Sequence, residues 1–188
     1  MKTRNFLFTS LLALASTVAA NAQTFDIDLL KAQPVYSAEK GQGYDILAAP
    51  KAKSNAPFFY SVKVADGNYK VTVVLGSKKK AGKTVVRAEN RRLMLDEVST
   101  RKGEFKTFSF IVNKRSPYIT DKMNVKIKPR EKETFTWDEK LTLEFTGAAP
   151  AVKSIKVEPA PAETTTVFLC GNSTVVDQFT EPYASWGQ

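Results

Sequence analysis

The sequence predicts a mainly β fold, a jelly-roll β-sandwich, from three observations. Apolar and polar residues alternate with a period of two from Thr24 to about Val157, which is typical of strands that bury one face. Turn-forming residues separate these segments at intervals of about ten residues. No amphipathic helix pattern precedes residue 160. These features favour one domain of about eight or nine short strands around a single core.

The first strand and a hairpin follow from this alternation. Residues 25–29 place Phe, Ile and Leu on one face and two Asp on the other, which predicts a half-buried strand. Segments 58–64 and 69–75 show the same pattern on either side of Asp66-Gly67-Asn68, a turn that tolerates positive φ. We therefore expect these two segments to pair as the clearest hairpin in the chain.

Shorter signals complete the predicted sandwich. Gly76 closes the preceding strand, and residues 77–82 predict a second hairpin loop. The remaining strands are expected at 84–98, 105–112, 125–129, 141–145 and 155–157.

Residues 1–22 carry the features of a cleavable secretory signal. Lys2 and Arg4 form a positive start, residues 6–20 are mostly apolar, and Ala20-Asn21-Ala22 is a small-x-small cleavage site. The apolar stretch is shorter than the roughly 20 residues that span a bilayer, which argues against a membrane anchor. We therefore expect a secreted or periplasmic protein with no membrane insertion after cleavage.

Cysteine and histidine usage excludes several kinds of site. Cys170 is the only cysteine, so the chain forms no internal disulfide, and it lies too far from the cleavage site for a lipid anchor. Its apolar surroundings predict a buried, unreactive thiol. The chain has no histidine, and one thiol cannot build a thiolate zinc site. No Asp or Asn cluster indicates calcium, so we expect neither a metal nor a cofactor.

A change in pattern divides the chain after the sandwich. Residues 158–163 have Pro at alternate positions, which predicts a short, stiff linker between a sandwich of residues 23–157 and a second unit of residues 164–188. Residues 167–170 are continuously apolar, as in a parallel strand covered on both faces. Because this strand has no parallel partner in the chain, we expect residues 164–188 to be poorly ordered or to add to an edge of the sandwich.

The formal charge of +9 points to an acidic partner, whose class the charge leaves open. Export and the lack of a reading helix or an RNA-binding signature argue against nucleic acid. The basic residues are dispersed, apart from Lys78-Lys79-Lys80 with Lys83. This run is either a solvated loop, the usual role of a short charge run, or a surface that attracts a uronic-acid polymer.

A serine follows the apolar segment after a tight glycine turn. In open α/β sheets, ligands bind beyond the carboxyl ends of the strands, so Ser173 after Gly171 is placed to meet a cleft. It is a candidate nucleophile or, alternatively, an ordinary loop or N-cap serine. A serine hydroxyl normally needs a neighbouring base, most often His, and this chain contains none.

The wider segment resembles a known family. Gly171-Asn172-Ser173-Thr174-Val175 with Asp177 and the downstream Trp186-Gly187-Gln188 is similar to the first block of the SGNH (GDSL-type) hydrolases, and looks closest to the rhamnogalacturonan acetylesterase group. The preceding chain looks like the galactose-binding-like sandwich that accompanies many such esterases, on residues 91–95, 103–105 and 137–145.

The resemblance implies a role for each matched residue. Ser173 would attack the acetyl carbonyl of an acetylated pectic polysaccharide, and its backbone N–H would donate to the oxyanion. Gly171, Asn172, Asp177 and Trp186 would support it, with Asn172 standing where the family usually has Asp. The base would come from a later Asp-x-x-His that this chain lacks. We therefore expect the first strand and serine elbow of an incomplete α/β domain, belonging to a secreted carbohydrate esterase and inactive alone.

Simpler interpretations remain for these residues and for the chain. Asp177 would otherwise favour the start of a helix, and Trp186 is either core packing or the floor of a sugar site. The alternative function is a non-catalytic carbohydrate-binding or structural sandwich, in which Tyr118, Phe135 and Trp137 stack on sugars or fill the core. A lipid acylhydrolase is a third, less favoured interpretation. The sequence does not indicate an oligomeric state.

Overall fold

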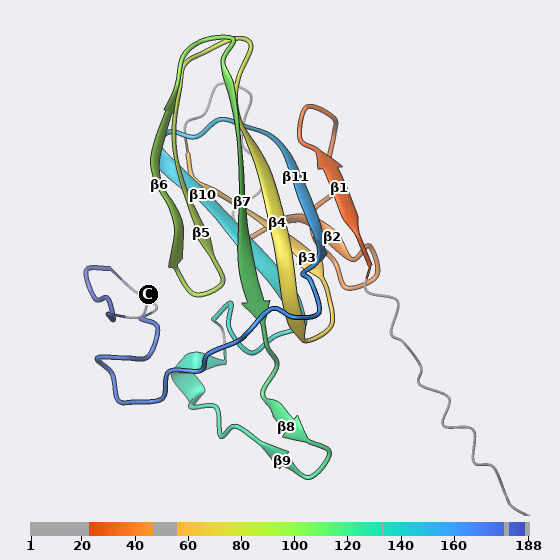
Figure 1. The fold of residues 1–188 in the computed structure, drawn as a ribbon, viewed down its shortest axis with the longest axis vertical. Coiled ribbons are helices and arrows are strands. Elements are labelled where there is room, and N and C mark those ends of the chain that lie inside the picture. The colour runs from red at the N-terminus through yellow and green to blue at the C-terminus, as the bar shows by residue number, and fades with distance from the viewer. Residues whose placement is uncertain (1–22, 47–55, 133, 179–180, 187–188) are drawn as a thin grey trace, which may run out of the picture.

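The protein is a sandwich of two antiparallel sheets (Figure 1). The structure is a computed structural model that describes residues 23–46, 56–132, 134–178 and 181–186. One sheet has the order β1–β11–β4–β7 and the other the order β2–β3–β10–β5–β6. The four-stranded sheet consists of β1 (Phe25–Asp28), β4 (Gly67–Gly76), β7 (Phe105–Lys114) and β11 (Val152–Pro159). The five-stranded sheet consists of β2 (Gln42–Asp45), β3 (Phe58–Lys63), β5 (Gly82–Ala88), β6 (Arg92–Thr100) and β10 (Lys140–Ala149).

Little else in the described chain is regular. A small hairpin of β8 (Tyr118–Thr120) and β9 (Met123–Asn124) protrudes at the lower end of Figure 1. A single 3₁₀ turn, Pro129–Glu131, is the one helical element among the described residues. The predicted mainly β sandwich is therefore confirmed. Within the described ranges, no helix has the length and apolar character needed to cross a bilayer.

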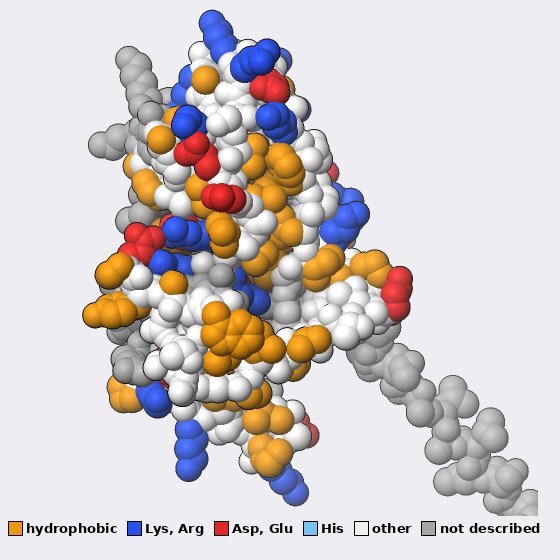
Figure 2. All heavy atoms as spheres, turned by 60° about the vertical axis from the view of Figure 1, so that its left-hand side comes forward, with side chains coloured by type: hydrophobic (Ala, Val, Ile, Leu, Met, Phe, Trp, Pro, Cys, Tyr) orange, Lys and Arg blue, Asp and Glu red, His pale blue; other side chains and the backbone are white. Residues whose placement is uncertain are grey.

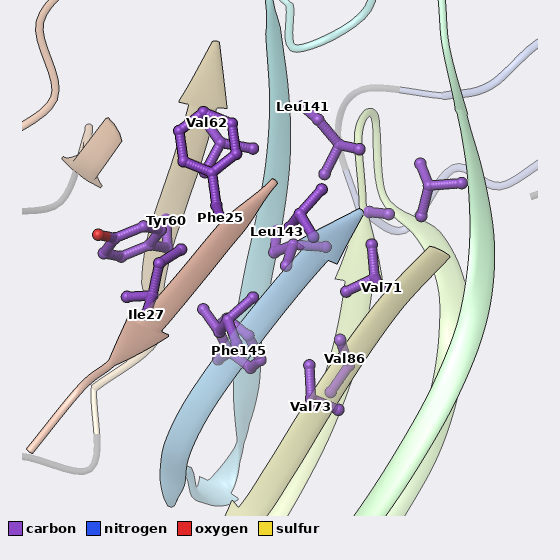
Figure 3. Close-up of a cluster of buried hydrophobic side chains, with 14 of the residues drawn as sticks. Phe25, Ile27, Tyr60, Val62, Val71, Val73, Val86, Leu141, Leu143 and Phe145 are labelled. Carbon is purple, nitrogen blue, oxygen red and sulfur yellow. The ribbon is translucent and has the colours of Figure 1, made fainter. Parts of the chain in front are cut away.

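Alternating side chains from both sheets form one core (Figure 3). Val71 and Val73 of β4 and Phe145 of β10 all point into this core, and all three are fully buried. The Phe145 ring stacks on that of Phe58 with a centroid distance of 5.0 Å. Burial of each such side chain contributes about 1.5–3 kcal/mol. The period-two pattern of the sequence thus places the predicted faces inward.

The predicted hairpin of residues 58–64 and 69–75 is wrong. β3 pairs with β2 and β10, whereas β4 pairs with β11 and β7 in the opposite sheet. The turn at Gly67, with φ of 152°, carries the chain across the core. An alternating pattern shows only that one face of each strand is buried. It is the same whether the two strands are neighbours in one sheet or lie in opposite sheets across the core.

Three smaller expectations also change. Residues 77–81 join β4 to β5 in the other sheet, so the loop predicted at 77–82 does not close a hairpin. The stretch 84–98 divides at a turn into β5 and β6, because Glu89 and Arg91 adopt positive φ of 53° and 64°. No strand forms at 125–129, where Pro129 instead begins the 3₁₀ turn.

The chain after the sandwich forms no strand among its described residues. Asn68, at the start of β4, holds it in place: its side chain donates to the Thr166 hydroxyl at 2.8 Å and to the Thr164 carbonyl at 3.3 Å. The expected first strand of an α/β domain at 167–170 is therefore wrong, and so is addition of this segment to a sandwich edge. The domain boundaries remain predictions, and the signal segment 1–22 lies outside the described residues.

Candidate functional site

The predicted serine elbow is an exposed turn. Val167, Phe168 and Leu169 are 75%, 63% and 53% exposed, so no buried strand leads into Ser173. Asn172 shapes the turn, because its side-chain oxygen accepts from the Thr174 N–H at 3.1 Å and from the Thr174 hydroxyl at 2.7 Å. These contacts are typical of an Asx turn.

Ser173 and Gly171 are exposed in this turn. The Ser173 carbonyl accepts from the Gln178 side chain at 2.7 Å, and no hydrogen bond of the Ser173 hydroxyl is found among the described residues. The nucleophilic role of Ser173 stays a prediction.

Asp177 fixes the tail to the sandwich. Its Oδ2 lies 3.9 Å from Arg92 Nε and 3.9 Å from Arg115 Nη2. Burial raises the pKa of this carboxyl, and the two guanidinium groups act in the opposite direction. Asp177 therefore joins the tail to the sandwich through two long ion pairs that do not fully offset the burial of its charge, and no helix begins at this position.

Trp186 and Cys170 are both more accessible than core residues. Trp186 is 69% exposed and meets the tail through its backbone N–H, which donates to the Thr174 carbonyl at 3.2 Å. It is therefore not core packing. Cys170 is a free, exposed thiol, so the expectation of a buried cysteine is wrong. Its apolar neighbours are exposed with it, since no sheet covers them.

A different set of residues forms a groove on the outer face of the five-stranded sheet. Phe59, Glu144 and Arg87 lie directly opposite one another on β3, β10 and β5. All three point away from the core, because they alternate with buried neighbours on their strands. One cross-strand row thus carries an aromatic ring, a carboxylate and a guanidinium.

Segments outside the sheet form the walls of this groove. Phe135, from the loop before β10, lies against Phe59 with a ring-centroid distance of 5.1 Å. Arg91, from the turn after β5, and Glu181, from the tail, stand at the other end. The hollow between these walls has a volume of about 750 Å³. We call this hollow the sheet groove. Its lining consists of Pro57, Phe59, Val85, Arg87, Asn90, Arg91, Phe135, Glu144, Thr146, Gly147 and Glu181.

Charges in the sheet groove are paired in a chain. Arg87 Nη1 lies 3.7 Å from Glu144 Oε2 and 3.1 Å from Glu181 Oε1, which is also 3.4 Å from Arg91 Nη2. Burial raises the pKa of Glu144, while the guanidinium groups of Arg87 and Arg91 act to lower it. The groove therefore presents hydrogen-bond donors and acceptors beside an aromatic surface.

The next rows of the same sheet are buried polar residues. The Ser61 and Thr142 hydroxyls lie 2.8 Å apart, and the Thr142 N–H donates to Glu89 Oε1 at 2.9 Å. On the other side, the Ser61 hydroxyl donates to Asp45 Oδ2 at 2.8 Å, and Lys140 Nζ donates to the same oxygen at 2.6 Å. These bonds fix the relative positions of β2, β3 and β10, and so hold the floor of the groove rigid.

The structure separates the three aromatic residues that the sequence offers for sugar stacking. Phe135 lies in the sheet groove. Trp137 lies beside it in the chain, and its ring carries the Arg115 guanidinium at 4.9 Å. Tyr118 is 73% exposed on the β8–β9 hairpin.

No metal centre is apparent in the described part of the chain. That part contains no group of three or more Cys, Asp or Glu side chains placed to hold a metal ion.

Neither a family model nor a curated protein matches the chain. Among solved structures, the chain is similar to a family 35 carbohydrate-binding module from Clostridium thermocellum. The two share 12% sequence identity over 69% of this chain and 100% of that one, with a TM-score of 0.32.

The resemblance to rhamnogalacturonan acetylesterase-like SGNH hydrolases is corrected by these findings. No family model matches the chain, so none of a hydrolase does, and no buried strand leads into Ser173. The physical reason is local: the short motif around Ser173 implied a strand at 167–170, and that segment is exposed and unpaired in the described chain. A short motif of this kind indicates a serine elbow only when a buried strand precedes it, and here none does.

Proposed function

We propose that this chain is a non-catalytic carbohydrate-binding β-sandwich of jelly-roll type whose ligand lies in the sheet groove. The observation that carries the proposal is the cross-strand row of Phe59, Glu144 and Arg87, extended by Phe135. Sugars present apolar C–H faces beside many hydroxyl groups. A binding site for them combines aromatic surface with a few fixed polar groups, as this groove does.

Each part of the sheet groove has a distinct role in this proposal. The rings of Phe59 and Phe135 offer an apolar platform for one sugar ring. The carboxylate of Glu144 accepts hydrogen bonds from hydroxyl groups, and the guanidinium of Arg87 donates them. Because the ion pairs already hold these side chains in place, little side-chain freedom is lost on binding.

A pectic polysaccharide is the first ligand to test. Affinity electrophoresis of the full chain through gels containing acetylated pectin, xylan or no polymer measures retardation directly. The Phe135→Ala variant removes one ring of the platform, and we expect it to weaken binding by about tenfold or more. Tyr118→Ala is the matched control, because it removes an exposed aromatic ring outside the groove.

Two results would reject the proposal. One is equal retardation of Phe135→Ala and the parent chain in a polymer that retards the parent at a salt concentration that screens charge-driven binding. The other is no retardation in any of a panel of plant and bacterial polysaccharides. Circular dichroism is the folding control, and we expect the β content of both variants to match that of the parent chain.

A further inference from the structure

The far tip of the sandwich brings two basic loops together. Residues 77–81 join β4 to β5, and residues 101–104 join β6 to β7. The Gly103 N–H donates to the Ser77 carbonyl at 2.9 Å, which ties the two loops side by side. Figure 2 shows Lys and Arg side chains gathered at this upper end of the molecule. We call residues 77–83 and 97–106 the basic tip.

The basic tip carries seven cations and two acids. Glu97 pairs with Lys83 at 2.9 Å, and Glu104 lies 3.7 Å from Lys106. Glu104 also accepts from the Arg101 N–H at 2.7 Å, a hydrogen bond that lowers its pKa. Both carboxylates are therefore already engaged, and a large positive excess remains on the tip. The cations are Lys78, Lys79, Lys80, Lys83, Arg101, Lys102 and Lys106.

A hollow on the basic tip is lined by three of these cations. They are Lys83, Arg101 and Lys106, and Glu104 lines the hollow with them. Its volume is about 540 Å³. Cations around an open hollow focus the field on whatever occupies it, and so favour a chain of negative groups.

We propose that the basic tip is a second binding site, for an anionic polysaccharide with repeated carboxylate or sulfate groups. Its partner is distinct from the ligand of the sheet groove, because the attraction comes from charge and needs no aromatic platform. The sequence indicated only the cluster of Lys78, Lys79, Lys80 and Lys83. Arg101, Lys102 and Lys106 are distant from it in the chain, and the fold brings them to the same tip.

Features of the tip favour a polysaccharide over other polyanions. Among the described residues, none of the exposed large apolar side chains belongs to the tip, whereas surfaces that bind membranes bury such side chains in the lipid. Its one aromatic residue, Phe105, is covered by Lys153 Nζ at 5.4 Å from the ring centroid. Single-stranded nucleic acids bind through stacking on exposed rings, which the tip does not offer.

Titration of the full chain with dextran sulfate, polygalacturonate and uncharged dextran tests this site. The triple variant Lys78→Ala, Lys79→Ala, Lys80→Ala removes three charges from the tip. The matched control is Lys122→Ala, Lys126→Ala, Lys128→Ala, which removes three charges at exposed positions on and after the β8–β9 hairpin. We expect the tip variant to bind the anionic polymers on the order of tenfold more weakly at low salt, and the control to bind within about twofold of the parent.

Further arms separate this site from the sheet groove and from other partners. Phe135→Ala should keep full affinity for dextran sulfate, which contains no pectic sugar, and added salt should weaken that binding. Equal losses in the two lysine variants would show that net charge alone is responsible, and would overturn the proposal. Tighter binding to phosphatidylglycerol vesicles than to either anionic polymer, or no binding to those polymers at low salt, would overturn it as well.

Discussion

The two sheets carry equivalent serine–threonine pairs on their outer faces, in opposite environments. On the five-stranded sheet, the Ser61 and Thr142 hydroxyls lie 2.8 Å apart and are almost fully buried. On the four-stranded sheet, the Thr72 and Ser109 hydroxyls lie at the same 2.8 Å distance, in a pair exposed to solvent. The same pair of hydroxyl groups is therefore shielded from solvent on one sheet and exposed to solvent on the other.

The difference arises from what covers each sheet. Beside Ser61 and Thr142, the five-stranded sheet carries Lys140, which donates to Asp45, and Glu89, which accepts from the Thr142 N–H. All three charged side chains are largely shielded from solvent. The four-stranded sheet presents mostly partly exposed charges, such as Lys70 opposite Glu158 at 3.8 Å. Buried polar groups hold strands in one arrangement because leaving any of them unpaired is costly.

The sheet groove lies where the covered and open parts of the five-stranded sheet meet. Phe59, Glu144 and Arg87 are next to the buried polar row, yet they are partly exposed themselves. This position provides a rigid floor and an open face at once, which the solvated outer face of the four-stranded sheet does not. The contrast between the two faces leads to four predictions.

The largest effect is expected from an ion pair whose side chains are 16% and 15% exposed. Lys140→Met removes the lysine that pairs with Asp45 and leaves its carboxylate largely shielded from water, so we expect a loss of about 3 kcal/mol in the free energy of unfolding. Although burial acts to raise the pKa of Asp45, hydrogen bonds from Lys140 and Ser61 hold it below its ordinary value. Urea denaturation measures the loss.

Lys70→Met is the control for this prediction, because it removes a lysine that pairs with an exposed carboxylate on the other sheet. We expect no measurable change in its stability. If both variants lost similar stability, the two sheet faces would not differ as described.

The second effect concerns pH. Burial raises the pKa of Glu89 to about 8 from an ordinary 4.5. Because the folded state holds this proton more tightly than the unfolded state, the free energy of unfolding should fall as the pH rises from about 4.5 through about 8. Glu89→Gln keeps an acceptor for the Thr142 N–H and has no proton to lose.

Thermal unfolding of Glu89→Gln and the parent at several pH values tests this directly. The variant should show a flatter profile between the two pKa values and should be the more stable protein at alkaline pH. Parallel profiles would mean that Glu89 titrates normally in the folded protein.

The third effect compares the two hydroxyl pairs. Thr142→Val leaves the buried Ser61 hydroxyl without one of its partners, and we expect it to cost about 1–2 kcal/mol. Thr72→Val exposes Ser109 to water that replaces the lost bond, so its cost should stay within about 0.5 kcal/mol. Equal costs from urea denaturation would show that burial does not distinguish the pairs.

The smallest effect is expected at the rim of the groove. Glu181 is largely exposed, so Glu181→Gln should change stability by less than about 0.5 kcal/mol. It also frees Arg87 and Arg91 from a competing carboxylate, and we expect the affinity for a bound sugar to change by less than about threefold. A large stability loss would instead indicate that the tail is part of the folding unit.

Local features of the chain were predictable from the alternation alone. Val71, Val73 and Leu75 were expected on one face of a strand, and all three are fully buried in the core. Phe135 was also proposed from the sequence as a sugar-stacking residue, and it lies in the sheet groove. Phe59 was not predicted as a site residue. Its large aromatic ring lies on the same strand face as Ser61 and Lys63, and an aromatic residue on a polar face indicates a binding surface.

The pairing of strands and the composition of the groove depended on contacts between distant segments. The sequence by itself determined which residues of each strand face inward, because side-chain direction alternates along any extended backbone. Only the tertiary structure decided that β3 and β4 belong to different sheets, and that Phe59, Glu144 and Arg87 form one row. The physical reason is that register is set by hydrogen bonds between strands far apart in the chain. The alternation within one strand does not indicate which strand pairs with it.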